Sequence, residues 1–152
     1  MLLGQFDHAV DAKGRVAVPA PFRPQLAAGA VVSIGPESRL VIWPTSAWET
    51  HLRHLTITAG TPAEQRKYLR RVNSGTRDVE LDSQGRLLVH PSHRDFASIR
   101  DRATFVGMGE YIELCATERW EEEARELTPD FFTELTDRIN PMGFIAPTPA
   151  PS

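Results

Sequence analysis

The chain has 152 residues, a hydrophobic content of 41% and a formal net charge of −3. This length fits one ordinary domain or two very small ones, and the hydrophobic content supports a packed core, which excludes general disorder. No stretch reaches the roughly 18 apolar residues of a membrane span, and the single cysteine, Cys115, excludes an intramolecular disulfide and a zinc site built on paired thiolates. We therefore expect a cytoplasmic protein.

The acidic charge is concentrated near one end of the chain. Residues 1–75 carry 9 Lys or Arg and 5 Asp or Glu, residues 76–109 carry 5 of each, and residues 110–152 carry 3 and 10. The first two segments are therefore basic or neutral, so the overall charge does not exclude a nucleic-acid partner. Of the 17 cationic residues 15 are arginine, which suits bidentate recognition of phosphate or guanine but can also reflect genome composition.

In chain order, the first predicted elements are two strands around a tight turn, over Gln5–Val10 and Val16–Val18. The turn has the sequence Asp-x-x-Gly, in which Asp11 can accept hydrogen bonds from the turn backbone. Gly14 supplies the left-handed conformation that a short loop needs. A short helix over residues 22–24 should follow.

Two further strands and two helices complete this unit. Strands are predicted over Val31–Ile34 and Leu40–Trp43, paired with each other across a turn. Ser46–Leu55 carries an amphipathic helical stripe. Thr61 should cap the next helix, with Glu64 completing the capping box.

The same order of elements then repeats. Val10–Pro19 aligns with Leu81–His90 at an offset of 71, and further matches follow at an offset of 72 after one inserted residue. Ordered matches over about 45 residues are too many for coincidence, so the chain carries an internal repeat. The second copy is predicted to contain strands over Leu87–Val89, Thr104–Val106 and Ile112–Cys115, a short helix at His93–Asp95, and helices over Glu118–Leu127 and Pro129–Ile139.

A β-unit of roughly 40 residues is too small to bury a core alone. The two copies should therefore pack on each other, with strands of one completing the sheet of the other. We predict a mostly β fold with flanking helices (α+β), made of pseudo-symmetric repeats at 1–75 and 76–139, each ending in a pair of helices. A disordered, proline-rich tail is predicted at 140–152.

The repeated loops are the strongest candidates for function. The turn itself accounts for four of their residues: Asp11, Gly14, Asp82 and Gly85. It does not require the arginines that follow, Arg15 and Arg86. Two arginines placed by pseudo-twofold symmetry make a cationic surface that could read a DNA groove.

The segments Gly4–Arg23 and Asp82–Val89, together with Gly107 and Trp120, resemble the MraZ family of bacterial transcriptional regulators over about residues 1–140. The resemblance implies a tandem, swapped-hairpin β-barrel like that of the AbrB regulators. It also implies binding to double-stranded DNA at short direct repeats upstream of the protein's own operon, in the division and cell-wall gene cluster. Assembly into rings, commonly of eight subunits, and a nucleoid-associated location in the cytoplasm are implied as well.

Carried over to this chain, the resemblance places DNA contacts in both loops. The candidate DNA-binding residues are Lys13, Arg15, Arg86, Arg23 and Arg94. Gln84 replaces a cation in the second loop, so that copy is expected to bind more weakly. His90 and His93 stand where the first copy has a proline and a phenylalanine, so the two copies need not play equal roles.

Other kinds of site are not favoured. The histidine pairs lack further metal ligands, Cys115 lies in an apolar strand that suits a packed thiol, and no phosphate-cradling Gly-x-x-x-x-Gly-Lys loop is present. We therefore expect no enzyme activity, cofactor, metal or small-molecule substrate. The alternative to a DNA-binding regulator is an AbrB-like protein-interaction or antitoxin-type module that docks through the C-terminal helices.

Overall fold

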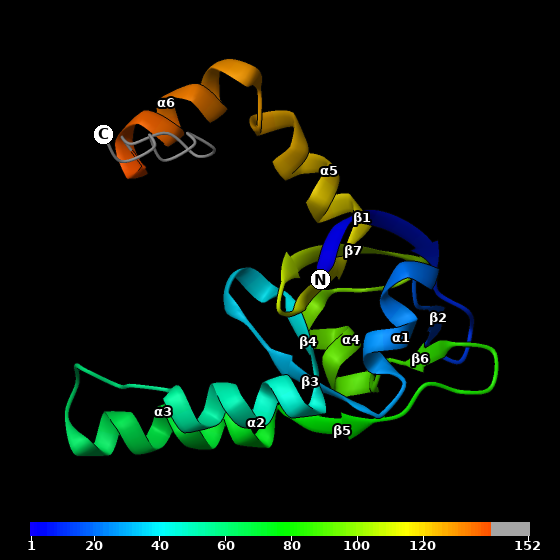
Figure 1. The fold of residues 1–152 in the computed structure, drawn as a ribbon, viewed down its shortest axis with the longest axis horizontal. Helices are drawn as coiled ribbons and strands as arrows, with labels where there is room; N and C mark the ends of the chain where they lie inside the picture. Colours follow the sequence, from blue (N-terminus) through cyan, green and yellow to red (C-terminus); the bar gives the residue numbers. More distant parts are fainter. Residues whose placement is uncertain (141–152) are drawn as a thin grey trace, which may run out of the picture. The chain divides into compact units, whose positions relative to one another are not determined.

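The computed structural model describes residues 1–140, so most of the predicted tail, residues 141–152, lies outside the described residues. The described chain divides into two compact units, one over Met1–Thr117 and one that begins at Glu118 (Figure 1). The first unit contains every strand of the described chain, and the second consists of helices. No helix within residues 1–140 is both long enough and apolar enough to cross a membrane.

The first unit is built from one large antiparallel sheet and one short ribbon. The sheet has the spatial order β1 (Leu2–Ala9), β7 (Arg102–Gly109), β8 (Ile112–Ala116), β4 (Leu40–Pro44), β3 (Ala30–Ile34) and β5 (Arg77–Val79). The ribbon pairs β2 (Arg15–Ala17) with β6 (Arg86–Leu88). The predicted mostly β fold with flanking helices is confirmed.

The two repeats are related by a pseudo-twofold axis that the strand register locates. In the ribbon, Val16 lies opposite Leu87, its own counterpart at an offset of 71. In the sheet, Val41 lies opposite Glu113, its counterpart at an offset of 72. The axis therefore passes between β2 and β6 and between β4 and β8, and it exchanges β1 with β5 and β3 with β7.

Strands of one repeat complete the sheet of the other, as predicted. β1 pairs along its whole length with β7, whereas its link to β2 is an isolated bridge between Val10, just after β1, and Val16. The strands on either side of the first loop therefore separate, and each finds its main partner in the second repeat. The two copies differ in the length of their first strand, because β5 has three residues where β1 has eight.

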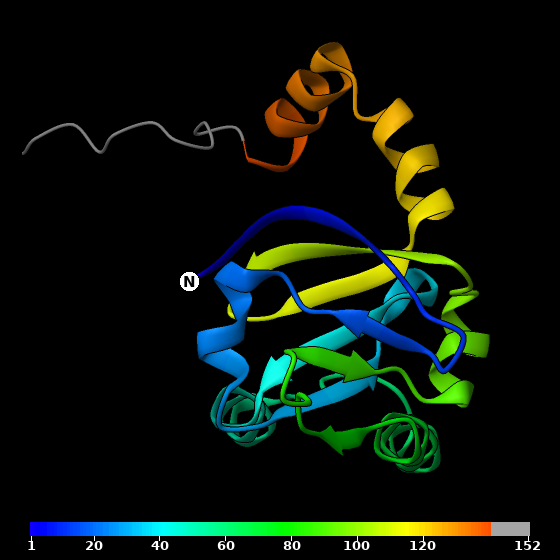
Figure 2. The same cartoon turned by 90° about the vertical axis from the view of Figure 1, so that its right-hand side faces the viewer.

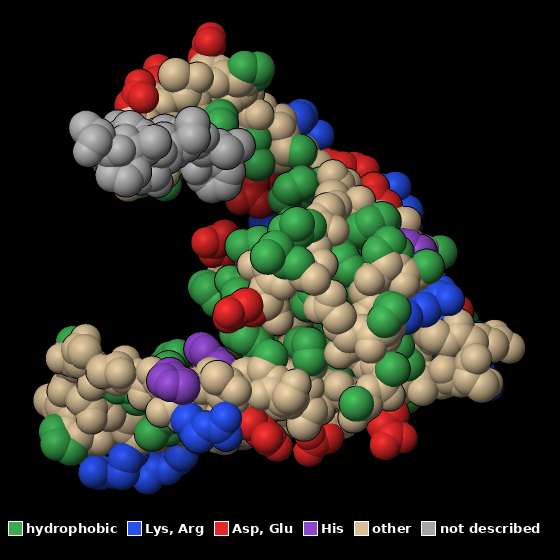
Figure 3. Space-filling model, in the orientation of Figure 1, with side chains coloured by type: hydrophobic (Ala, Val, Ile, Leu, Met, Phe, Trp, Pro, Cys, Tyr) green, Lys and Arg blue, Asp and Glu red, His purple; other side chains and the backbone are tan. Residues whose placement is uncertain are grey.

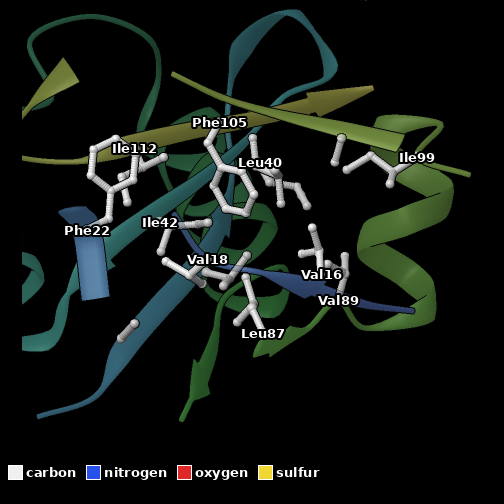
Figure 4. Close-up of a cluster of buried hydrophobic side chains, with 14 of the residues drawn as sticks. Val16, Val18, Phe22, Leu40, Ile42, Leu87, Val89, Ile99, Phe105 and Ile112 are labelled. Atoms are coloured by element: carbon white, nitrogen blue, oxygen red, sulfur yellow. The ribbon is translucent and has the colours of Figure 1, made fainter. Parts of the chain in front are cut away.

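The core lies between the sheet and the ribbon and draws on both repeats (Figure 4). Alternate strand residues face it, as a period of two requires. The largest buried side chains are those of Phe22, Phe105, Leu2, Leu26, Leu40, Ile42, Leu87, Ile112 and Leu114. Each such side chain contributes about 1.5–3 kcal/mol when it is fully buried, so the core favours the joined repeats over separate ones.

Short helices connect the strands, and longer pairs follow each β-unit. The connecting helices are η1 (Ala20–Phe22), α1 (Arg23–Leu26), η2 (Pro36–Ser38) and α4 (Pro91–Ala97). The helical pairs are α2 (Thr45–His54) with α3 (Pro62–Ser74), and α5 (Thr117–Glu126) with α6 (Pro129–Ile139). The predicted capping box is present, since Glu64 N–H donates to Thr61 Oγ1 at 3.2 Å and Thr61 N–H donates to Glu64 Oε1 at 3.1 Å.

Candidate nucleic-acid interface

The loop between β1 and β2 is organised by one carboxylate. Asp11 Oδ1 accepts the backbone N–H groups of Lys13 and Arg15, each at 2.9 Å, and Asp11 Oδ2 accepts Arg15 Nε–H at 2.8 Å. The backbone N–H of Gly14 donates to the Asp11 carbonyl at 2.9 Å and closes the turn. A single side chain therefore folds the loop and also fixes the direction of the arginine that follows it.

The loop between β5 and β6 repeats this arrangement atom for atom. Asp82 Oδ1 accepts the N–H groups of Gln84 at 2.9 Å and Arg86 at 3.0 Å, and Asp82 Oδ2 accepts Arg86 Nε–H at 2.8 Å. Hydrogen bonds, led by the backbone N–H of Arg86, lower the pKa of Asp82, and the equivalent bond from Arg15 lowers the pKa of Asp11. Both carboxylates are therefore ionised at neutral pH and paired with an arginine.

The two arginines lie on the same face of the β2–β6 ribbon. Val16 and Leu87 point into the core, so their strand neighbours point outward. Arg15 lies opposite Leu88, and Ala17 lies opposite Arg86. With two residues of stagger and one strand spacing, the two arginine Cα atoms are about 8 Å apart. In Figure 2 the ribbon, drawn as a blue and a green arrow near the centre, faces the viewer between its two loops.

Leu88 is a feature of this face that sequence reasoning missed. Its side chain is 57% exposed between the two arginines of the ribbon. The signal was present in the sequence, because two consecutive leucines in a strand must point to opposite faces, and Leu87 is the buried one. An exposed apolar side chain beside arginines suits contact with a thymine methyl group.

Lys13 and Gln84 occupy equivalent positions at the two loop tips, and both are exposed. The first tip therefore carries a cation and the second a neutral amide. That the two loops bind DNA with unequal strength stays a prediction.

Arg23 and Arg94 are placed differently from the other candidates. Arg23 Nε–H donates to the carbonyl of Val18 at 2.8 Å, and Arg94 Nε–H donates to the carbonyl of Val89 at 3.2 Å. Neither lies in a loop; Arg23 begins α1 and Arg94 lies within α4. Each guanidinium packs against the glycine of the opposite repeat's loop.

The two loop glycines meet two requirements at once. Gly14 and Gly85 have φ of 84° and 74°, the left-handed region that other residues rarely adopt. A Cβ at Gly14 would also lie 2.8 Å from Arg94 Nε, and one at Gly85 would lie 2.7 Å from Arg23 Nε. The turn explained these glycines in the sequence; the close approach of an arginine is a second reason that only the structure provides.

The two histidine pairs of the sequence, His51 with His54 and His90 with His93, have contacts other than a metal ion. His51 stacks on Trp43 with 4.7 Å between ring centroids, and His54 Nδ1 lies 2.8 Å from the Thr50 carbonyl. His90 caps α4 by accepting the Ser92 N–H. Among residues 1–140, no group of three or more His, Cys, Asp or Glu side chains is placed to hold a metal ion. Cys115 is buried in β8.

His93 is the buried counterpart of Phe22 in the first repeat. Its Nε2 lies 2.7 Å from the carbonyl oxygen of Gly75. Burial lowers the pKa of His93 below its usual value, against the opposing effect of the hydrogen bond to Gly75. We therefore assign His93 a packing role.

Comparison with known proteins agrees with the tandem architecture. The family profile described as "MraZ protein, putative antitoxin-like" matches residues 1–71 and 73–140. The transcriptional regulator MraZ of Herpetosiphon aurantiacus is 36% identical over 121 residues, which cover 80% of this chain and 85% of that protein. The transcriptional regulator MraZ of Limosilactobacillus reuteri is 34% identical over 140 residues, which cover 92% and 98%. The chain therefore belongs to the MraZ family of transcriptional regulators.

Proposed function

We propose that this protein binds double-stranded DNA through the outer face of its β2–β6 ribbon and thereby regulates transcription of the division and cell-wall gene cluster, including its own operon. The observation that carries the proposal is the placement of Arg15 and Arg86, both partly exposed, on one outward face of the ribbon, each oriented by an aspartate. The gene cluster and the direct-repeat boxes follow from the family resemblance. This activity places the protein in the cytoplasm, at the nucleoid.

The chemistry of the site suits base reading as well as phosphate binding. With Nε engaged by Asp11 or Asp82, each arginine still has two terminal amino groups to donate. Such groups pair well with the O6 and N7 acceptors of guanine or with phosphate oxygens. A two-stranded ribbon also fits the major groove, which is about 12 Å wide.

One ribbon makes few contacts, so the affinity of a single subunit should be low and sensitive to salt. Several ribbons that engage adjacent DNA boxes together gain affinity through effective concentration. We therefore propose that the protein acts as a ring, for which eight subunits are expected from the resemblance.

We propose that the helical pairs form the contacts between subunits of this ring. Residues 45–74, which contain α2 and α3, carry 5 Lys or Arg and 2 Asp or Glu, whereas residues 117–139, which contain α5 and α6, carry 3 and 8. Lys and Arg side chains gather on α3 in Figure 3, and Asp and Glu side chains lie over α6. Contact between the basic pair of one subunit and the acidic pair of the next is heterologous, and such contacts form a ring where the rotation between subunits closes.

Both helical pairs also expose apolar side chains. An apolar groove beside α2 and α3 is lined by Leu52, Leu55, Tyr68 and Val72. On α6, Phe131 and Phe132 are 40% and 55% exposed. Burial of these side chains between neighbouring subunits would add a hydrophobic contribution to the charge attraction.

A gel shift with DNA from upstream of the protein's own gene, at two salt concentrations, tests the proposal. The wild-type protein should shift this DNA at the lower salt concentration and less at the higher. Arg15→Ala should nearly abolish the shift while native mass spectrometry shows an intact assembly. The matched control is Arg138→Ala, which removes an exposed arginine from α6 and should leave the shift in place.

Two outcomes would contradict the proposal. If an intact Arg15→Ala assembly binds this DNA normally, the ribbon is not the reading surface. If the wild-type protein gives no shift and purifies with another protein, the alternative of a protein-interaction module is favoured. The exposed apolar residues of α6 would then be the first candidates for its docking face.

A further inference from the structure

We propose that Arg23 and Arg94 are positioning residues, each of which holds the DNA-reading loop of the opposite repeat. This inference rests on the proposed DNA-binding function. It assigns to these two arginines a role different from the direct DNA contact expected of them as candidate DNA-binding residues.

The first contact joins α1 of the first repeat to the loop of the second. Arg23 is tied to its own repeat by the bond from Nε to the Val18 carbonyl at 2.8 Å. Its guanidinium lies directly over Gly85, where a Cβ would be 2.7 Å from Nε and 2.9 Å from Cζ. Gly85 immediately precedes Arg86. Arg23 therefore limits where the start of β6, and with it Arg86, can lie.

The second contact is related to the first by the pseudo-twofold axis. Arg94 is bound to the Val89 carbonyl, and its guanidinium lies over Gly14, where a Cβ would be 2.8 Å from both Nε and Cζ. Gly14 precedes Arg15. The same contact occurs twice, at positions that match in the repeat. This repetition indicates that the contact holds the loops in place.

Backbone hydrogen bonds join the loops at the same points. Val18 N–H donates to the Gly85 carbonyl at 3.0 Å, and Val89 N–H donates to the Gly14 carbonyl at 2.9 Å. Each arginine thus donates a hydrogen bond to the carbonyl of a valine. The N–H of that same valine donates to a glycine carbonyl in the loop of the opposite repeat. Removal of Arg23 should loosen the second loop, and removal of Arg94 should loosen the first.

Double-mutant cycles on DNA binding test this crossed pattern. In binding to duplex DNA from upstream of the gene, Arg23→Ala should couple with Arg86→Ala, so that the double variant loses less affinity than the product of the single losses, by a factor on the order of 10. Arg23→Ala combined with Arg15→Ala should show no such coupling. For Arg94→Ala the pattern should be reversed, with coupling to Arg15→Ala only.

Two further measurements separate positioning from contact with DNA. Arg15→Ala should reduce the slope of log affinity against log salt by about one for each ribbon that engages the DNA, because each ribbon loses one phosphate-type contact, whereas Arg23→Ala should leave the slope unchanged. Arg23→Lys retains the positive charge but has no Nε–H group to bond the Val18 carbonyl. A positioning role predicts that Arg23→Lys binds DNA as weakly as Arg23→Ala. If Arg23→Ala does not fold, Arg23→Lys serves as the test protein in its place.

Amide hydrogen exchange provides a readout without DNA. In Arg23→Ala the amides of Val18 and Gly85 should exchange faster, while those of Val89 and Gly14 stay protected. Equal coupling of Arg23 to both loop arginines, rescue of binding by lysine, or unchanged exchange would overturn the inference. Failure of the wild-type protein to bind DNA would instead contradict the proposed function, and the exchange experiment would still decide the role of Arg23.

Discussion

Asp11 combines two tasks that a conservative substitution can separate. In Asp11→Asn, Oδ1 can still accept the N–H groups of Lys13 and Arg15, but the amide that replaces Oδ2 cannot accept Arg15 Nε–H. We expect the turn and the thermal stability to be retained. DNA affinity should fall on the order of 10-fold, the equivalent of one charge-assisted hydrogen bond of about 1.4 kcal/mol.

Fluorescence anisotropy with a labelled duplex measures this loss. Asp78→Asn, which removes one exposed negative charge from β5, is the matched control and should bind no more weakly than the wild type. An Asp11→Asn protein with wild-type affinity would show that Arg15 needs no partner to read DNA.

His93 should make the stability of the protein depend on pH. Burial lowers the pKa of His93 from 6.5, so below that pH the unfolded chain takes up a proton that the folded protein resists. The wild-type protein should therefore lose stability as the pH falls from about 6.5 toward the lowered pKa. Electrostatic interactions with Arg77, His90 and Arg71 lower the pKa of His93 in the same direction.

His93→Phe places in the second repeat the residue that the first repeat carries at this position. We expect the free energy of unfolding of this variant to change less between pH 7.5 and pH 5.5 than that of the wild type, as measured by urea denaturation. Equal pH dependence in both proteins would show that another group is responsible.

At the scale of elements, β1 depends on the closeness of its approach to β7. A Cβ at Gly107 would lie 2.5 Å from the Leu2 carbonyl oxygen and from the Leu3 nitrogen, both of which are backbone atoms. Gly107→Ala should therefore push β1 away and expose Leu2, which is fully buried. We expect a loss of about 2 kcal/mol or more in urea denaturation. The exposed neighbour Met108→Ala should cost much less; an equal cost for both would mean that β1 shifts freely.

The existence and type of most elements could be predicted from local sequence. Thr61 and Glu64 marked the start of α3, and alternation of apolar residues marked the strands of both repeats. The pairing of the strands around each loop was harder to predict. Alternation of apolar residues indicates which face of a strand is buried, but it does not indicate which strand is its neighbour. Only the argument that one repeat cannot bury a core led to the exchange of strands between repeats.

The candidate site shows the same division. Asp11, Arg15 and their counterparts could be found from the repeated loops, because a turn explains every repeated residue except the arginine. The contact of Arg23 with Gly85 could not be found this way, because 62 positions separate the two residues and nothing local links them. A motif can assign an arginine to a family position. The contacts of that arginine in the structure decide whether it binds DNA or positions a loop.

At the scale of the whole molecule, the net charge of −3 averages two surfaces of opposite sign, and this opposition allows a sharp test of the ring. Arg66→Glu with Arg70→Glu reverses charge on one face of α3, and Glu122→Arg with Glu126→Arg reverses it on one face of α5, since residues four apart share a helix face. Each double variant alone would place like charges across every subunit contact. Native mass spectrometry should then show smaller species than for the wild type.

Mixing the two double variants should restore the assembly. The acidic α3 of the first variant can meet the basic α5 of the second, and the basic α3 of the second can meet the acidic α5 of the first. Every contact in an alternating ring is then attractive, so the restored assembly should contain equal numbers of the two proteins and therefore an even total number of subunits. Glu80→Arg, which reverses an exposed charge outside both helical pairs, should leave the wild-type mass unchanged. Full-sized assemblies of either double variant alone would rule out this head-to-tail contact, because opposite charges would then not be what joins the subunits.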